Sequence, residues 1–491
     1  MKANISTKQA LLFTVINYIG VVIGVVSTIL IYPQDKEMLG VIRFVDACAQ
    51  IMYPIIVLGS THALINYYPK LNERLQSKLF SFSLLSLFKL ALCLGIVLFI
   101  GMFFYQGEDM KFILYAYPLA FSMAYIELFR RQATNLQKIS FPTFFEKIIP
   151  KITLPTVFLL VIYLQYSISK ALVLYILSYF LIALVIGWYI YRYFKFKWHW
   201  SYSDLFTDIS KREYYQYSLF AFAGSFGSFF AFRVDSLMIP YFISYEANGT
   251  YNIGVALAST LAIPATGVFA LYAPVISELL NKGDLRTLNY KYKEVARSMF
   301  FIGMFLFSCT VVGIADLFQL MPTYDKLAPS LPIIYLLGIN VVINMSTGFN
   351  TEIISYSKYY RFNLVSILCL MVLNVLLNIY FLTQTTYGIL GVGIASMLSL
   401  TLFNVGKTYY IYKKMRLWPF DSMFMKLFFV MIGICLLVFY LPSVGSHIGD
   451  LLVKVFLVLC LNLYVLFKTQ WAEGLRSQVV KILVRIFNLK M

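Results

Sequence analysis

Charge is the scarcest feature of this sequence. Of its 491 residues, 13% are charged and 60% are hydrophobic, whereas about a quarter of the residues of an average soluble domain carry charge. The hydrophobic residues gather in runs of about 20 that short polar segments separate, which is the pattern of membrane-spanning helices. The composition excludes an ordinary soluble protein and predicts an all-α polytopic membrane protein.

Residues that carry metal, redox or catalytic chemistry are also few. The three histidines lie far apart, and the six cysteines are scattered through apolar runs without a Cys-x-x-Cys pair, so we expect neither a metal site nor a disulfide framework. The sequence has no GxxxxGK[ST] phosphate-binding loop, no pair of carboxylates beside a polar loop and no Ser/His/Asp set. We therefore expect a transporter that has no cofactor and is not an enzyme.

The basic residues follow membrane topology. A net charge of +18 would suggest a nucleic-acid partner for a soluble chain, but cytoplasmic loops of membrane proteins are enriched in lysine and arginine. With a cytoplasmic N-terminus, most of the 40 lysines and arginines fall on cytoplasmic segments, and Lys36, Lys111, Lys170 and Lys326 fall on the opposite side. We expect both termini to be cytoplasmic and no nucleic acid to bind.

The hydrophobic runs predict fourteen membrane spans joined by short connections, so consecutive helices run antiparallel. An even number of spans places both termini on the same side of the membrane. The expected spans are 9–32, 39–67, 79–104, 112–137, 142–165, 169–194, 216–243, 250–280, 295–320, 331–357, 360–383, 387–412, 421–441 and 450–467.

Two of these spans correspond to each other and indicate an internal duplication. Gly40 opens the second span and Gly249 opens the eighth, and when these glycines are aligned Pro54 lies one residue from Pro264. A six-helix unit repeated in the same direction is a parallel repeat, whose two lobes face a central cavity. Because an interior proline removes a backbone hydrogen bond and allows bending, Pro54 and Pro264 are hinge candidates.

The duplication suggests how the chain is divided. The last segment alternates apolar and basic residues at helical spacing, which predicts an interfacial helix that binds anionic membrane lipid. The expected parts are an N-terminal lobe at 1–194, a cytoplasmic linker at 195–215, a C-terminal lobe at 216–413, two additional helices at 414–467 and a basic amphipathic tail at 468–491.

Arg233 and Asp235 lie in the middle of the seventh span. Two residues along a helix correspond to about 200°, so the two side chains point to opposite faces, and each needs a partner on another helix or water. Unpaired cations within a membrane usually face a wet cavity or bind an anion. We therefore predict that Arg233 lines a cavity, and that Asp235 completes a salt bridge between helices or accepts a coupling proton.

Other charged residues within the spans are weaker candidates. Lys89 stands alone near the centre of the third span and is a second candidate cavity cation. Arg43 and Asp46 are three residues apart and can pair on one helix face, which a structural ion pair explains as well as a function does. Glu127 can pair with an arginine three or four residues later. Arg43 remains a candidate cavity cation, and Asp46 and Glu127 remain candidates for ion coupling.

Three segments resemble the polysaccharide-transporter branch of the multidrug/oligosaccharidyl-lipid/polysaccharide exporter superfamily. The first segment resembles an element in the second helix of that family that begins with a glycine; its sequence here is LGVIRFVDACAQIMYPIIVLGSTHALINYYPK. RVDSLMI followed by GTYNIGVAL resembles the start of its second lobe, and YGILGVGIASMLSL resembles its twelfth helix. With the fourteen spans, the likeness covers essentially the whole chain. Asn66 stands where many relatives have arginine.

The resemblance implies two six-helix lobes, as in multidrug exporters of this superfamily, with two extra C-terminal helices. It further implies a flippase of the bacterial inner membrane for a polyprenyl-diphosphate-linked oligosaccharide such as an O-antigen repeat of lipopolysaccharide. Its cationic cavity would fall on Arg233, Lys89 and Arg43, and polysaccharide polymerase machinery would be a partner.

Other functions stay open at this point. One alternative is a drug/cation antiporter of the same superfamily, which would favour acidic cavity residues, and another is a flippase for a peptidoglycan precursor. A membrane-embedded glycosyltransferase or polymerase is disfavoured because the expected outer loops are short.

Overall fold

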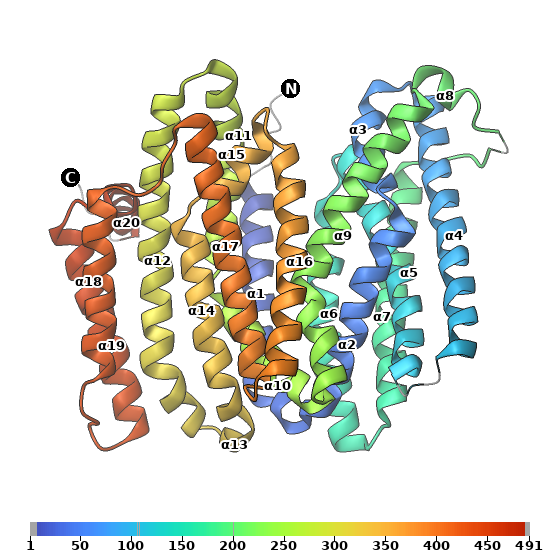
Figure 1. Ribbon diagram of the computed structural model, residues 1–491. Helices are drawn as coiled ribbons and strands as arrows, with labels where there is room; N and C mark the ends of the chain where they lie inside the picture. Colours follow the sequence, from blue (N-terminus) through green and yellow to red (C-terminus); the bar gives the residue numbers. More distant parts are fainter. Residues whose placement is uncertain (1–6, 106, 108, 200, 487–491) are drawn as a thin grey trace. The chain divides into compact units, whose positions relative to one another are not determined.

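The computed structural model describes residues 7–105, 107, 109–199 and 201–486, and within these ranges the secondary structure is helical, without a β-strand (Figure 1). Twelve of the described helical segments are long and apolar enough to cross a membrane, and Ile19–Leu30 is a shorter apolar segment. Each of the fourteen expected spans coincides with one helix or with two consecutive helices. The prediction of an all-α polytopic membrane protein is confirmed.

The chain divides into two compact units, residues 1–252 and 253–491. Helix α10 (Tyr245–Thr260) contains the boundary. The helices of the first unit are α1 (Thr7–Leu30), η1 (Tyr32–Asp35), α2 (Lys36–Val57), α3 (Ser60–Tyr67), η2 (Tyr68–Lys70), α4 (Glu73–Phe104), α5 (Asp109–Asn135), α6 (Ser140–Leu164), α7 (Ile168–Tyr193), α8 (Leu205–Asp208) and α9 (Lys211–Phe242).

The second unit contains the remaining helices. They are α11 (Ile263–Lys282), α12 (Leu285–Gln319), α13 (Tyr324–Leu327), η3 (Ala328–Ser330), α14 (Leu331–Ser346), α15 (Asn350–Tyr356), α16 (Arg361–Gln384), α17 (Ile389–Met415), α18 (Ser422–Phe439), α19 (His447–Lys468) and α20 (Glu473–Ile486).

Three spans that the sequence predicts as continuous are broken into two helices each. Between α2 and α3 the backbone turns at Leu58 and Gly59, which have φ of 42° and 74°. Gly348, with φ of 60°, separates α14 from α15, and a short turn separates α10 from α11. Left-handed conformations end a helix at little cost where glycine adopts them. Hydropathy averages over such a turn, so the prediction that each of these three spans is one continuous helix was wrong.

The two prolines proposed as hinges lie close to two of these breaks. The carbonyl of Pro54 accepts the N–H of Leu58 at 2.8 Å and so closes the last turn of α2. Pro264 is the second residue of α11, where the missing N–H of proline costs no helical hydrogen bond. A hinge function for either residue remains a prediction.

The aligned glycines of the duplication pack against each other. A Cβ atom on Gly40 would lie 1.7 Å from the carbonyl oxygen of Tyr245, and one on Gly249 would lie 1.9 Å from the carbonyl oxygen of Lys36. Tyr245 and Lys36 each lie four residues before the opposite glycine, so the contact is reciprocal. Asn248 also donates to the Gly40 carbonyl at 2.8 Å. Only glycine allows this approach of α2 to the start of α10.

The contacts and the duplication divide the chain differently. Helix α9, which the repeat places at the start of the C-terminal lobe, packs along α2 in the first unit. The linker expected at 195–215 is fastened to α4, because Lys78 pairs with Asp204 at 2.6 Å. This hydrogen-bonded ion pair holds the pKa of the Asp204 carboxyl below its usual range. The lobe limits derived from the repeat remain a prediction.

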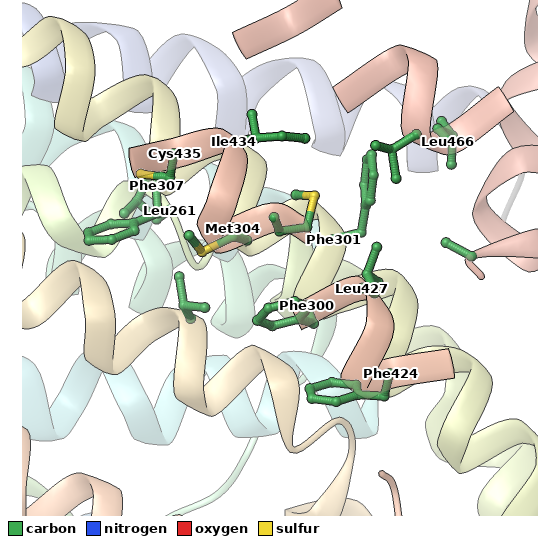
Figure 2. Close-up of a cluster of buried hydrophobic side chains, with 14 residues drawn as sticks. Leu261, Phe300, Phe301, Met304, Phe307, Phe424, Leu427, Ile434, Cys435 and Leu466 are labelled. Carbon is green, nitrogen blue, oxygen red and sulfur yellow. The ribbon is translucent and has the colours of Figure 1, made fainter. Parts of the chain in front are cut away.

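The core of the second unit brings the additional C-terminal helices onto α12 (Figures 1 and 2). Asp421 caps the start of α18 by accepting the N–H of Phe424 at 2.8 Å, and it pairs with Arg297 of α12 at 3.3 Å. The buried hydrophobic cluster beside this link includes Leu261, Phe300, Phe301, Met304, Phe307, Phe424, Leu427, Ile434, Cys435 and Leu466.

The C-terminal tail forms a helix, as predicted. Leu475 and Val479 of α20, together with Trp471, pack against the cluster of Figure 2. The side chains of Lys481 and Arg485 lie outside the described residues. Binding of this tail to anionic lipid remains a prediction.

We expect Gly40→Ala to destabilise the protein by about 1–3 kcal/mol, the usual cost of overpacking, because the new methyl group would collide with a backbone carbonyl. Gly249→Ala should have a similar effect. Thermal unfolding of the purified protein in detergent, monitored by size-exclusion chromatography, measures the difference in unfolding temperature between variant and unaltered protein.

Gly24→Ala is the matched control, because a Cβ atom there meets nothing within 4 Å, and it should leave the unfolding temperature unchanged or slightly higher. If Gly40→Ala behaves like this control, the close approach of α2 and α10 is absent in the protein.

Candidate functional site

Arg233 lies on α9, half-buried, and is held by a neutral partner. Its Nε donates to Oε1 of Gln50 on α2 at 2.8 Å. Among the residues that the structure describes, no carboxylate oxygen lies within 4.0 Å of its guanidinium. A glutamine amide orients a guanidinium but is not a direct counter-ion for its charge. Arg233 therefore remains available to an anion.

A pair of charged residues on α2 interacts with Arg233 and with a tyrosine of α7. Arg43 pairs with Asp46 at 3.4 Å, which confirms the expected pairing on one helix. Asp46 is 6% exposed and accepts the hydroxyl of Tyr175 at 3.0 Å. Arg43 and Asp46 both interact electrostatically with Arg233. Two guanidinium groups thus share one carboxylate, and this part of the first unit carries an excess of positive charge.

The first unit contains a cavity of about 410 Å³, which is within the range of small-ligand pockets. Its lining comes from α2, α5, α6, α7 and α9 and includes Gln50, Tyr53, Glu127, Arg130, Glu146 and Tyr179. Gln50 both lines the cavity and binds Arg233, so the guanidinium lies behind a residue of the cavity lining and is not itself part of that lining.

Glu127 lies at the centre of a network on the α5 and α6 side of this cavity. Its carboxylate accepts hydrogen bonds from Arg130, and from Nε of Arg131 at 2.6 Å. Nε of Arg130 also lies 3.3 Å from Oε2 of Glu146. The predicted pairing of Glu127 with a nearby arginine is confirmed, and both arginines take part. Ion coupling by Glu127 or Asp46 remains a prediction.

Asp235 lies on a different face of α9 from Arg233. Its carboxylate, 9% exposed, accepts the hydroxyl of Tyr251 at 2.6 Å. The partner of Arg233 lies on α2 and that of Asp235 lies on α10, so the expectation that the two side chains diverge is confirmed. A role for Asp235 in ion coupling remains a prediction.

Lys89 is not brought to the cavity. It is exposed on α4 and is not part of the cavity lining described above. A role for Lys89 in substrate binding remains a prediction that the geometry of the first unit does not support.

Lys407 of the second unit is a buried cation that the sequence analysis missed. It is 1% exposed, donates to the hydroxyl of Thr351 and lies 4.5 Å from the centre of the Phe403 ring. The sequence groups it with Lys413 and Lys414, which are exposed at the end of α17. Its position two turns before them was the available signal, because a lysine so far from the helix end reaches the interface less easily.

The neutral residues of the site were also missed. Gln50, Tyr175 and Tyr179 carry no charge, so a search for charged residues within the spans passes over them. Gln50 lies seven residues after Arg43, which places both on one face of α2, and this spacing could have identified it.

The chain was compared with known proteins. No protein-family model matches it. It is 24% identical over 271 residues to the capsular polysaccharide biosynthesis protein CapF of Staphylococcus aureus, a match that spans 52% of the chain and 64% of CapF, less than two thirds of that protein.

Solved transporter structures resemble the chain more completely. An inward closed conformation of the lipid II flippase MurJ superposes with a TM-score of 0.71 and 12% identity, covering 96% of the chain and all of MurJ. An inward-facing multidrug resistance MATE transporter of the MOP superfamily superposes with a TM-score of 0.62 and 15% identity, covering 83% of the chain and 96% of that protein. The chain is a multi-pass membrane protein whose fold is that of these two solved structures, as the resemblance implied.

The Arg43–Asp46 pair should contribute to stability through its burial. We expect Asp46→Asn to destabilise the protein by about 2 kcal/mol, because it leaves Arg43 and Arg233 without their shared carboxylate. The double variant Arg43→Gln/Asp46→Asn should lose less than the sum of the single variants. Thermal unfolding of the four proteins gives the coupling energy.

The exposed ion pair Lys282–Glu278, 2.5 Å apart, is the control for this double-mutant cycle. Its coupling energy should be below about 0.5 kcal/mol. Additive effects of the Arg43 and Asp46 substitutions would contradict the assigned interaction.

Proposed function

We propose that the protein is a flippase that moves a polyprenyl-diphosphate-linked oligosaccharide from the inner to the outer leaflet of the bacterial cytoplasmic membrane. The observation that carries the proposal is Arg233, a guanidinium whose hydrogen-bond partner is the neutral amide of Gln50, a residue of the cavity lining. The transporter fold and the partial match to a capsular polysaccharide biosynthesis protein support it.

The chemistry of a diphosphate fits the positive part of the site. Arg233 and Arg43 offer guanidinium donors in the planar arrangement that binds phosphate oxygens, and Asp46 offsets one of the two charges. The diphosphate would bind Arg233, the oligosaccharide would occupy the polar cavity, and the polyprenyl chain would stay in the lipid. Rocking of the two lobes would then expose the head group on the outer side.

The membrane potential would favour this direction of transport. Moving two negative charges out of a negative interior is favourable by about 4.6 kcal/mol per 100 mV, at about 2.3 kcal/mol for each charge. Export of O-antigen units, contact with polysaccharide polymerase machinery and binding of anionic lipid by the tail belong to the same proposal.

The contacts of the acidic residues bear on the antiporter alternative. A transporter of cationic drugs needs a carboxylate that is free to bind a cation, but Glu127 is paired with two arginines and Asp46 with one. Neither carboxylate is therefore free to bind a cation.

We expect Arg233→Ala to lower the rate of flipping by at least about tenfold, because it removes the guanidinium that has no direct ion pair and would bind phosphate. Arg233→Lys should retain part of the activity. The rate is measured in proteoliposomes as the appearance of polyprenyl-diphospho-oligosaccharide at the outer surface, with the amount of folded protein measured in parallel.

Arg212→Ala is the control on the same helix, because Arg212 is exposed near the start of α9, and it should flip at the rate of the unaltered protein. Loss of folded protein equal to the loss of flipping would instead show that Arg233 is structural.

Deletion of the gene separates the alternatives. The proposed function predicts that a polyprenyl-linked glycan accumulates on the inner leaflet. Altered drug sensitivity without such accumulation would support an antiporter, and arrest of cell-wall growth would support a peptidoglycan-precursor flippase.

A further inference from the structure

The charged residues in and around the cavity of the first unit fall into two groups. At Gln50 the cavity adjoins Arg233, where positive charge is in excess. On the α5 and α6 side its lining contains Glu127, Glu146, Arg130 and Lys147, two carboxylates and two cations. A phosphate needs excess positive charge, whereas a balanced set of donors and acceptors suits a neutral polar ligand.

Glu146 has a carboxylate oxygen that forms an ion pair but accepts no hydrogen bond among the described residues. Its Oε2 atom is buried and, among the described residues, accepts no hydrogen bond, although it lies 3.3 Å from Nε of Arg130. A buried carboxylate oxygen without a donor is costly. Because Glu146 lines the cavity, a hydroxyl group of a ligand could supply the missing hydrogen bond.

Aromatic side chains provide part of the remaining wall. Tyr53 of α2 and Phe229 of α9 meet edge to face, with ring centres 5.0 Å apart, and Tyr179 of α7 also lines the cavity. Aromatic faces pack against the C–H faces of sugar rings, while a tyrosine hydroxyl forms hydrogen bonds. Carboxylates, an arginine and aromatic rings together match a polyhydroxylated ligand.

We propose that Glu146, Glu127, Arg130 and Tyr53 form a saccharide subsite, separate from the phosphate-binding Arg233. The assignment rests on the proposed function and adds the position of the sugars to it. Gln50 joins the two parts, because it lines the cavity and binds Arg233. The sugars nearest the diphosphate would therefore contact Glu146 and Tyr53, and these two residues would determine which glycan is accepted.

A cationic ligand fits this subsite less well. Arg130 and Lys147 line the cavity together with Glu146, and Arg131 binds the other carboxylate. These positive charges repel a cation, but they can donate hydrogen bonds to a sugar hydroxyl or acetamido oxygen.

Two lipid probes separate the subsites. One is polyprenyl diphosphate without sugar, and the other is the same lipid carrying one N-acetylhexosamine. Binding of each to the full-length protein in detergent is measured by titration. We expect Glu146→Gln and Tyr53→Ala to weaken binding of the glycosylated lipid by about tenfold, the effect of losing one charge-assisted hydrogen bond or one sugar-packing ring. Binding of the sugar-free lipid should change less than about twofold.

Arg233→Ala should weaken binding of both lipids by the same factor. Glu278→Gln is the control carboxylate, because Glu278 is exposed in the second unit, and it should leave both affinities unchanged. Thermal unfolding of each variant shows whether it is folded, and Glu146→Asp replaces Glu146→Gln if that variant is not.

The outcomes that overturn the proposals differ. If Glu146→Gln and Tyr53→Ala weaken binding of both lipids equally, or of neither, the saccharide subsite is wrong while the proposed function stands. If Arg233→Ala changes neither affinity, the phosphate-binding role in the proposed function is wrong while the subsite stands. If the unaltered protein binds neither lipid, both proposals fail.

Discussion

The cost of holding charge inside a membrane governs the arrangement of the first unit. Each buried charge there needs an opposite charge, a hydrogen bond or water. Asp46 is satisfied by Arg43 and Tyr175, and Glu127 by two arginines. Arg233 alone among these has no ion pair in the described contacts, where its hydrogen-bond partner is the uncharged Gln50. Helices α2, α5, α7 and α9 supply these groups, so the same contacts that stabilise the unit also define the cavity.

Close packing of backbones sets where these groups lie. Gly40 and Gly249 bring α2 and the start of α10 into direct contact, and Asn248 adds a hydrogen bond to the carbonyl of Gly40. This fixes α2, which carries Arg43, Asp46 and Gln50 on the turns that follow. Small residues at a helix contact are a general means of association in membranes, where hydrophobicity alone does not hold helices together.

The sequence predicted the helices far better than it predicted the contacts between them. The hydrophobic runs located a helix for every expected span, although α9 is not among the twelve described segments long and apolar enough to cross a membrane. Helical spacing predicted the pairing of Arg43 with Asp46 and the divergence of Arg233 from Asp235. The sequence could not show the breaks at Gly59 and Gly348, because local backbone conformation has little effect on hydropathy. Gln50 was missed because it is uncharged, and the exposed position of Lys89 depends on how α4 packs, which no local pattern contains.

The amide of Gln50 has a consequence for the rate of turnover. A carboxylate in its place would compete with an incoming phosphate, and each cycle would have to break and remake an internal ion pair. An amide oxygen occupies one N–H of the guanidinium and leaves the other donors free. Under the proposed function, a phosphate could then arrive and depart without displacing a protein anion, so its residence time would depend on its own contacts.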